Sequence, residues 1–224
     1  METYSDGFNS KVIGLGAGGH AKVLIEILLA MGTVEIAGLL DIDPKLWKSK
    51  QLGIAVLGSD ELLPKLFEDG IRQVFIGVGS TGESNLRRNL FAKARHLGFV
   101  VIPCIHPRAM ISPSATFGEG PNVMAGAVVN SAARIGANVI VNTGAIVEHD
   151  CLLEDHSHVA PGARLGSGVM VGEGAHIGIG ASVRQCIRIG RNSVVGVGAA
   201  VVSDVPDGTI VVGVPARPLR KVKA

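Results

Sequence analysis

Hydrophobic residues recur at every sixth position through the second half of the chain. Residues 111–206 divide into 16 consecutive blocks of six, and each block opens with Ile, Val, Leu or Phe. The fifth residue of a block is usually small, most often Ala. Neither an α-helix nor an ordinary β-strand has a period of six, so the repeat itself must be the structural unit.

Six residues are enough for one short strand and one corner. Three such blocks close a triangular coil of 18 residues, in which the aliphatic first residue points inward and stacks on its equivalent one coil later. The small fifth residue would let the backbone turn the corner. We therefore predict a left-handed parallel β-helix, a prism of a little over five coils. A right-handed β-solenoid is the structural alternative, but its repeats are longer and less regular.

In the first half, short apolar runs alternate with segments of helical period. Strands are expected over residues 11–16, 34–41, 73–79 and 99–105, and helices over residues 21–31, from Ser59 onward and over residues 85–97. Such alternation predicts a parallel sheet with crossover helices, so we expect a Rossmann-like α/β domain. The predicted domains span residues 1–106 and 107–224.

Composition narrows the class of protein further. Hydrophobic residues make up 47% of the chain and the net charge is +2, which argues against disorder and against nucleic acid or an anionic membrane as partner. Cys104, Cys151 and Cys186 form no CxxC pair, so neither a disulfide framework nor a zinc site is expected. The N-terminal residues lack the pattern of a secretion signal, and the apolar run 23–31 is too short to span a bilayer. We expect a cytoplasmic protein.

Four segments carry a resemblance to a known family. They are IGLGAGGHAKV (residues 13–23), IHPRAMISPSA (105–115), NTGAIVEHDCLLEDHSHVAPGA (142–163) and VGVPARPL (212–219). With the six-residue repeats, they resemble the hexapeptide-repeat acetyltransferases that modify sugars for surface polysaccharides and glycoproteins. The resemblance covers nearly the whole chain, from about Lys11 to Leu219.

The resemblance implies an activity and an assembly. The expected reaction is transfer of acetyl from acetyl-CoA to the 4-amino group of a nucleotide-linked 4-amino-4,6-dideoxyhexose. The nearest alternative is O-acetylation of sialic acid or another sugar by the same machinery. A homotrimer of prisms is implied as well, with acetyl-CoA in the groove between two prisms and the front domain holding the nucleotide-sugar.

The same resemblance points to His149 as the catalytic base and to Asp150 as its neighbour. Transfer from a thioester to an amine needs a base that removes the proton of the amine, and histidine suits that role with an ordinary pKa of about 6.5. Asp150 would orient His149 or raise its basicity. On spacing alone, the pair also fits a solvated corner. Cys151 is a conceivable nucleophile, but it occupies the small fifth position of its block, so we expect direct attack.

Further positions match the acetyl-CoA site of the family. His158, nine residues after His149, is expected to contact acetyl-CoA near the reacting end. Asn142 would support the site. The remaining matches, Ser167, Ile179 and Val197, would lie along the CoA groove and offer mainly backbone groups, with ordinary coil packing as the alternative. The family often has Gly in place of Ser167 and Val197, which bears on the fit of their side chains but not on a contact made by the main chain.

The glycine-rich segment at residues 14–19 satisfies GxGxxG between a predicted strand and a predicted helix. Glycine permits the tight turn, and a helix N-terminus favours phosphate. Read alone, the segment is a weak dinucleotide site. In the family context it binds the nucleotide-sugar, and the expected contacts are Gly18, Gly19, His20, Asp41 and Gly79.

The sequence leaves other interpretations open. His158 and His176 are 18 residues apart and should stack on one face. The γ-class carbonic anhydrases use this prism with metal-binding histidines that bridge subunits, but here a convincing third ligand is missing, the anhydrases have no Rossmann-like front domain, and no metal is expected. Arg217, Arg220 and Lys221 fit either CoA phosphates or a solvated basic end. A non-catalytic trimeric binding protein is the remaining alternative.

Overall fold

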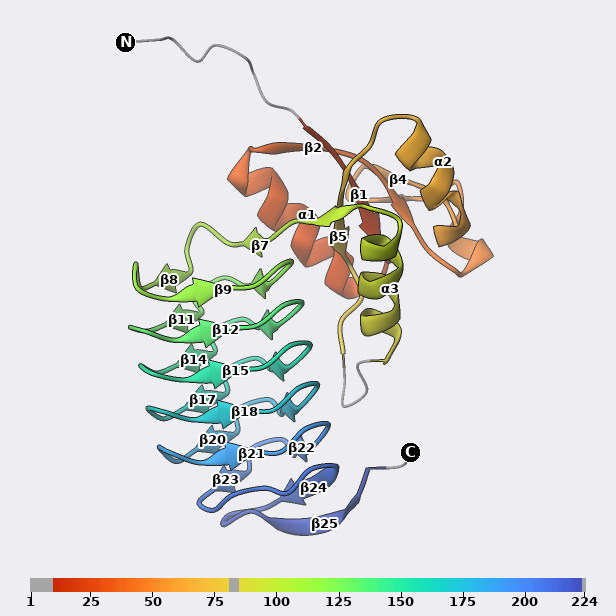
Figure 1. Ribbon diagram of the computed structural model, residues 1–224. Helices are drawn as coiled ribbons and strands as arrows, with labels where there is room; N and C mark the ends of the chain where they lie inside the picture. Colours follow the sequence, from red (N-terminus) through yellow and green to blue (C-terminus); the bar gives the residue numbers. More distant parts are fainter. Residues whose placement is uncertain (1–9, 81–84, 223–224) are drawn as a thin grey trace, which may run out of the picture.

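The computed structural model describes residues 10–80 and 85–222 (Figure 1). The outer ends of both predicted domains, residues 1–9 and 223–224, lie outside the described residues. A front domain of sheet and helices stands beside the first coils of a long prism of short strands, and helix α3 runs down along the prism (Figure 1).

The sheet of the front domain is six-stranded, in the order β3-β4-β2-β1-β5-β6. Neighbours pair in parallel except β3 and β4. The sequence analysis missed β3 and β4, in which no alternation of buried and exposed residues extends over more than a few positions. The strands are β1 (Ser10–Leu15), β2 (Val34–Leu40), β3 (Lys50–Gln51), β4 (Ile54–Gly58), β5 (Gln73–Ile76) and β6 (Val100–Val101).

Helices cover this sheet close to their predicted places. Ser59 begins the second helical segment as expected, because its side chain accepts a hydrogen bond from the backbone N–H of Glu61 at 3.4 Å. The helices are α1 (Gly19–Met31), α2 (Leu63–Glu68) and α3 (Asn85–His96), with single 3₁₀ turns η1 (Pro44–Leu46) and η2 (Asp60–Leu62). The predicted Rossmann-like arrangement is confirmed.

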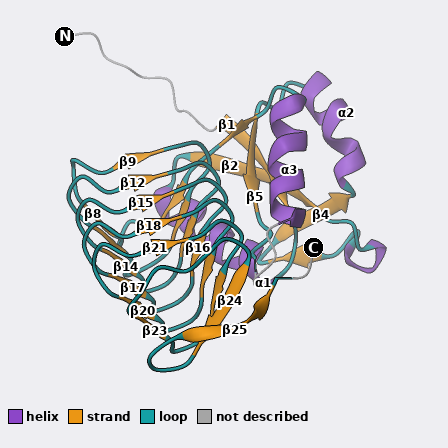
Figure 2. Ribbon diagram, turned by 60° about the horizontal axis from the view of Figure 1, so that its bottom comes forward, coloured by secondary structure: helices purple, strands orange, loops and turns teal. Residues whose placement is uncertain are grey.

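Three sheets form the prism, which is the predicted left-handed β-helix. The docking face, which meets the front domain, comprises β7 (Cys104–Ile105), β10 (Asn122–Val123), β13 (Ile140–Val141), β16 (His158–Val159), β19 (His176–Ile177), β22 (Val194–Val195), β24 (Thr209–Val212) and β25 (Arg217–Lys221). The six-stranded face comprises β8 (Met110–Ile111), β11 (Val128–Val129), β14 (Ile146–Val147), β17 (Arg164–Leu165), β20 (Ser182–Val183) and β23 (Ala200–Val201). The five-stranded face comprises β9 (Thr116–Phe117), β12 (Arg134–Ile135), β15 (Leu152–Leu153), β18 (Met170–Val171) and β21 (Arg188–Ile189). Figure 2 shows the coils stacked on one another.

The coil period of 18 residues is confirmed by the pairing of the strands. Val123 pairs with Val141, and Val141 with Val159, each a step of 18 positions. These first residues of the blocks are buried in one continuous core. Stacking of aliphatic side chains along the prism axis therefore supplies the hydrophobic free energy that closes the coils.

The corner geometry differs from the prediction. The fifth residue of a block does not make the turn; it points into the core, as fully buried Ala127 and Ala145 show. The fourth residue adopts the left-handed conformation, usually as Gly but also as Asn138 and Asp150 with φ of 56° and 60°. Asn and Asp tolerate this conformation better than most residues, which explains their place in the repeat.

The two ends of the prism also differ from the prediction. Cys104–Ile105 pairs with β10, so the segment expected as one closing strand over residues 99–105 is divided between the front sheet and the prism. At the other end, Ile189 pairs with Val205 across 16 positions, so the last block is two residues short. The final strand, β25, then pairs antiparallel with β24.

The front domain packs tightly on the prism. Buried side chains of α1 and of the docking face, among them Leu24, Ile25 and Ile140, belong to one hydrophobic cluster. Along α3, contacts reach the corner between the five-stranded and docking faces on three coils: Arg95 pairs with Glu119, the Phe91 ring meets His156 at 5.5 Å between centroids, and Arg88 pairs with Glu173 at 3.2 Å. The two domains therefore share one rigid junction.

Candidate active site

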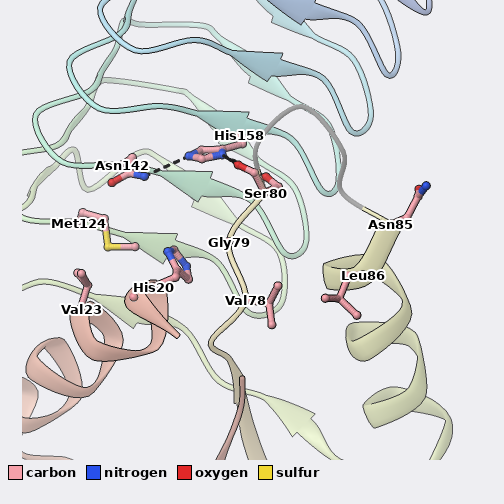
Figure 3. A pocket seen from close by; sticks show the side chains of 11 residues that line it. His20, Val23, Val78, Gly79, Ser80, Asn85, Leu86, Met124, Asn142 and His158 are labelled. Carbon is pink, nitrogen blue, oxygen red and sulfur yellow. Dashed lines mark hydrogen bonds between the residues drawn. The ribbon is translucent and has the colours of Figure 1, made fainter. Parts of the chain in front are cut away.

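A cavity of about 650 Å³ lies where the front domain meets the docking face (Figure 3). We call it the junction cavity. Its walls come from the start of α1, the chain after β5, the start of α3 and the prism. The lining residues are Gly19, His20, Val23, Val78, Gly79, Ser80, Asn85, Leu86, Met124, Asn142 and His158.

Three of the residues predicted to bind the nucleotide-sugar line this cavity: Gly19, His20 and Gly79. Gly18 is the N-cap of α1, and no described atom lies within 4 Å of where a Cβ would stand on Gly18 or Gly19. The helix N-terminus is thus open on this side, and its unpaired N–H groups favour an anionic ligand such as phosphate.

Asp41 does not line the junction cavity, and its carboxylate makes structural hydrogen bonds. One carboxylate oxygen accepts from the N–H of Ala17 at 2.7 Å, and the other accepts from the N–H of Asp43 at 3.0 Å. The carboxylate therefore fixes the glycine-rich loop. Asp41 lines a smaller cavity of about 120 Å³, which shares only Val78 and Leu86 with the junction cavity.

His158 is held in one tautomer by its neighbours. Its Nδ1 lies 2.8 Å from the carbonyl oxygen of Ser80 and 3.1 Å from the Ser80 hydroxyl, and Nε2 lies 3.1 Å from Nδ2 of Asn142. A carbonyl oxygen only accepts, so Nδ1 carries the proton and Nε2 accepts from the Asn142 amide. Figure 3 shows both bonds at the edge of the cavity.

The charge state of His158 follows from its burial. The side chain is 7% exposed, and burial together with nearby His176 lowers its pKa to about 3. Burial likewise lowers the pKa of His20 to about 3, with the positive charge of Arg87 as a second cause, and it lowers the pKa of His176. The histidines around the cavity are therefore neutral at physiological pH.

A second cavity, the corner groove, has a volume of about 380 Å³ and runs along the corner between the docking face and the six-stranded face. It contains Ile179 and Val197, which are 53% and 75% exposed. The two cavities share Ser80, Asn142 and His158. These three residues therefore stand where a ligand in the groove meets one in the junction cavity.

His149 and Asp150 lie on a different corner of the prism, between β14 and β15, where the six-stranded and five-stranded faces meet. Nδ1 of His149 lies 2.7 Å from Oδ2 of Asp150, and the side chains are 55% and 67% exposed. Ser167 follows His149 by one coil on this corner. Within one chain, the predicted base and Ser167 are thus separated from the corner groove and the junction cavity.

The sequence analysis missed several residues of the junction. Ser80, Met124 and Leu86 line the cavity, and Asn122 and Arg87 are buried behind it. Asn122 takes the outward sixth position of its block, where polar residues are ordinary, so the sequence alone gave no sign of its burial. Arg87 sits in a helix that looked merely basic and amphipathic.

Clusters of metal ligands and membrane-spanning helices are absent from the part of the chain that the structure describes. There, no group of three His, Cys, Asp or Glu side chains is arranged to hold a metal ion. The rings of His158 and His176 do stack as predicted, edge to face at 4.8 Å. Residues 10–80 and 85–222 contain no helix that is long and apolar enough to cross a membrane.

Comparison with known proteins places the chain in a family. A family model described as the PglD N-terminal domain matches residues 11–94. A solved variant of the GDP-perosamine N-acetyltransferase from Caulobacter crescentus, in complex with CoA and GDP-perosamine, is 43% identical, with 94% of this chain and 97% of that chain covered and a TM-score of 0.88. No curated protein matches the chain.

Two further structures agree. The acetyltransferase domain of PglB from Neisseria gonorrhoeae, in complex with acetyl coenzyme A, is 40% identical, covers 95% of this chain and 100% of that chain, and has a TM-score of 0.86. WeeI from Acinetobacter baumannii is 27% identical, covers 93% and 100%, and has a TM-score of 0.80. The chain belongs to the hexapeptide-repeat family of acetyl-CoA-dependent sugar N-acetyltransferases.

Proposed function

We propose that this enzyme acetylates the 4-amino group of a nucleotide-linked 4-amino-4,6-dideoxyhexose. The observation that carries the proposal is the meeting of the two cavities at Ser80, Asn142 and His158. The junction cavity, open to the N-terminus of α1, suits an anionic nucleotide-sugar. The corner groove suits the long chain of acetyl-CoA, so the amine and the thioester meet at the shared residues.

The reaction is a direct attack in a ternary complex. The sugar nitrogen attacks the thioester carbonyl, a C–N bond forms and the C–S bond breaks. His149 accepts the proton of the amine and returns it to the departing CoA thiolate. Asp150, 2.7 Å from Nδ1 of His149, favours the tautomer in which Nε2 is the free base.

This mechanism requires a second copy of the chain. His149 projects from one corner of the prism, whereas the meeting point of the cavities is on another corner, so the complete site forms between neighbouring subunits of a homotrimer. The six-stranded face offers an apolar surface for such contact: Met110, Val128 and Ile146 stack outward on consecutive coils, and Met110 is 63% exposed. Light scattering should give the mass of a trimer.

A substrate panel tests the reaction. Thiol release from acetyl-CoA would be measured with GDP-, UDP- and dTDP-linked 4-amino-dideoxy sugars, each beside its 4-hydroxy counterpart, and with free sialic acid. We expect turnover with one amino sugar and none with its hydroxy counterpart. Turnover only with sialic acid would instead assign O-acetylation.

Subunit complementation tests the shared site. His149→Ala and Asn142→Ala should each be inactive alone, because each damages every site of its own homotrimer. Co-expressed, the two variants form mixed trimers in which some sites combine an intact His149 from one subunit with an intact Asn142 from the next. Activity should return in the mixture; a mixture as inactive as its parents would place the whole site within one chain.

The cytoplasm is the compartment proposed for this reaction. Cys104, Cys151 and Cys186 are all free thiols, and Cys186 is exposed. Exposed free thiols fit a reducing compartment. Fractionation of the native host, followed with an antibody, should place the protein with cytoplasmic markers.

A further inference from the structure

A buried arginine stands behind the junction cavity. Arg87, in the first turn of α3, is 1% exposed. Its guanidinium donates to the carbonyl oxygens of Ile76 and Val78 at 2.8 Å each and to that of Asn138 at 3.3 Å. Within residues 10–80 and 85–222, no carboxylate lies within ion-pair distance of it. Neutral oxygens from both domains therefore solvate a full positive charge at their junction.

Asn122 links this charge to the cavity. With its amide oxygen toward Arg87, Asn122 accepts from Nη2 of Arg87 at 3.0 Å and from Nε2 of His20 at 3.1 Å, while its NH₂ donates to the carbonyl of Pro121 at 3.2 Å. The reverse orientation would turn the NH₂ toward the guanidinium and leave it only Nε2 of His20 at 3.1 Å and the carbonyl oxygen of Ile76 at 3.5 Å as acceptors. The first orientation satisfies more donors and acceptors, and in it Nε2 of His20 carries the proton.

His20 faces the cavity with its other nitrogen. In Figure 3 its ring stands at the start of α1 beside the chain at Gly79, and a Cβ built on Gly79 would lie 3.6 Å from Nδ1 of His20. Because Nε2 is the proton-bearing atom, Nδ1 is an unprotonated acceptor. A sugar bound in the cavity can offer a hydroxyl or amino N–H to it.

We propose that Arg87 is a positioning residue: through the amide of Asn122 it holds His20 as the neutral Nε2–H tautomer, so that Nδ1 accepts a hydrogen bond from a hydroxyl or amino group of the sugar. The inference rests on the proposed function, which puts the sugar in this cavity. It adds that the positive charge of Arg87 determines which partner donates in the hydrogen bond between His20 and the sugar.

The positive charge of Arg87 adds to the burial that keeps His20 neutral. A protonated His20 would donate from both nitrogens, and its Nδ1–H would point at the donor of the substrate. The titratable groups that act on His20 are Arg87 behind Asn122 and the neutral His158 of the docking face, while the thiol of Cys104, whose pKa burial raises to about 12, lies near Arg87. Arg87 alone carries charge among them, and its charge opposes protonation of His20.

The tautomer can be measured without substrate. Long-range ¹H–¹⁵N correlation spectra of histidine-labelled trimer, with His20 assigned by a His20→Gln variant, report which ring nitrogen carries the proton. We expect the Nε2–H form from pH 8 down to pH 5. An Nδ1–H tautomer, or titration near the ordinary pKa of about 6.5, would overturn the proposal.

An isosteric change tests the role of the charge in binding. Asn122→Asp keeps both acceptor contacts but neutralises Arg87, so the pKa of His20 should rise. The KM for the amino sugar should then increase about tenfold at pH 6 and recover toward pH 8.5, while the KM for acetyl-CoA stays unchanged. A KM raised equally at every pH would mean a structural defect and would contradict the proposal.

A neighbouring variant controls for the docking of α3. Arg88→Gln removes the pair with Glu173 from the same helix but touches neither Asn122 nor His20. It should leave the tautomer and the pH dependence of KM as in the wild type; a shift equal to that of Asn122→Asp would overturn the assignment to Arg87. If no amino sugar is acetylated by the wild type, the proposed function fails, but the spectra still decide the tautomer.

Discussion

The prism and the front domain place their functional groups in different ways. Each coil of the prism has the same backbone, so a side chain at the third position of a block stands exposed on a corner, and one at the sixth position stands outward on a face. His149, Ser167, Ile179 and Val197 are all third-position residues. The front domain instead uses single loops, such as the one fixed by Asp41.

This difference separates stability from function in the two regions. A corner residue of the prism is exposed, and its removal leaves the stacked core intact. At the junction, by contrast, His158 is buried and His20 is partly buried between the domains, so the same side chains contribute both to the cavity and to the stability of the fold. Variants at a prism corner should therefore change activity but not stability, whereas variants of the junction histidines should change stability as well.

The largest effect is expected from His149→Ala. Loss of a general base lowers turnover by roughly 10²- to 10⁴-fold, and kcat should fall by that amount while the KM for the amino sugar changes little. The melting temperature should stay within about 1 °C of the wild type because the side chain is exposed. Unchanged kcat in correctly folded protein would remove His149 from the role of base.

The second prediction concerns acid stability and the buried histidines. The pKa of His20 and of His158 is about 3 in the folded protein, whereas an unfolded histidine has about 6.5. The unfolded state therefore binds more protons below pH 6.5, and the free energy of unfolding falls as the pH drops from 6.5 toward 3. At pH 5 the loss is about 2 kcal/mol for each histidine.

Denaturant unfolding at pH 8 and pH 5, at one protein concentration, measures this effect. His158→Gln removes one of the two groups, so the loss of stability between the two pH values should be about 2 kcal/mol smaller than in the wild type. At pH 8 the free energy of unfolding of the variant differs from that of the wild type only through the contacts that His158 makes. An equal loss in both proteins would show that His158 does not remain neutral in the fold.

The sequence predicted the regular region better than the junction, for a physical reason. A period of six, kept by aliphatic residues at one position, determines the coil, the core and the corner on which His149 stands. The short last block escaped detection because Val205, which pairs with Ile189, also fits the inward fifth position of a full block. The roles of Arg87 and Asn122 could not be predicted, since their burial depends on how the front domain packs against the prism.

A smaller effect is expected in the front domain from Gly19→Ala. The added methyl meets no described atom within 4 Å, and Ala is favoured over Gly at the start of a helix, so stability should be equal or slightly higher. The methyl would occupy space at the mouth of the junction cavity. We expect the KM for the nucleotide-sugar to rise about tenfold, about 1.4 kcal/mol, with kcat nearly constant. A variant with unchanged KM would place the nucleotide-sugar away from α1.

The smallest effect is expected from Ser167→Ala, on the corner that carries His149. In the described structure the backbone N–H groups of Ser167, Ile179 and Val197 donate to no acceptor, so these three positions offer free main-chain donors that side-chain changes leave in place. If acetyl-CoA is held mainly by such donors, the KM for acetyl-CoA should change less than about twofold, since a lost side-chain hydrogen bond would cost about 1 kcal/mol or more. Steady-state kinetics with saturating amino sugar measure this value. An increase of tenfold would show that the hydroxyl itself binds the cofactor chain, and the regular backbone of the prism would then not suffice to form the groove.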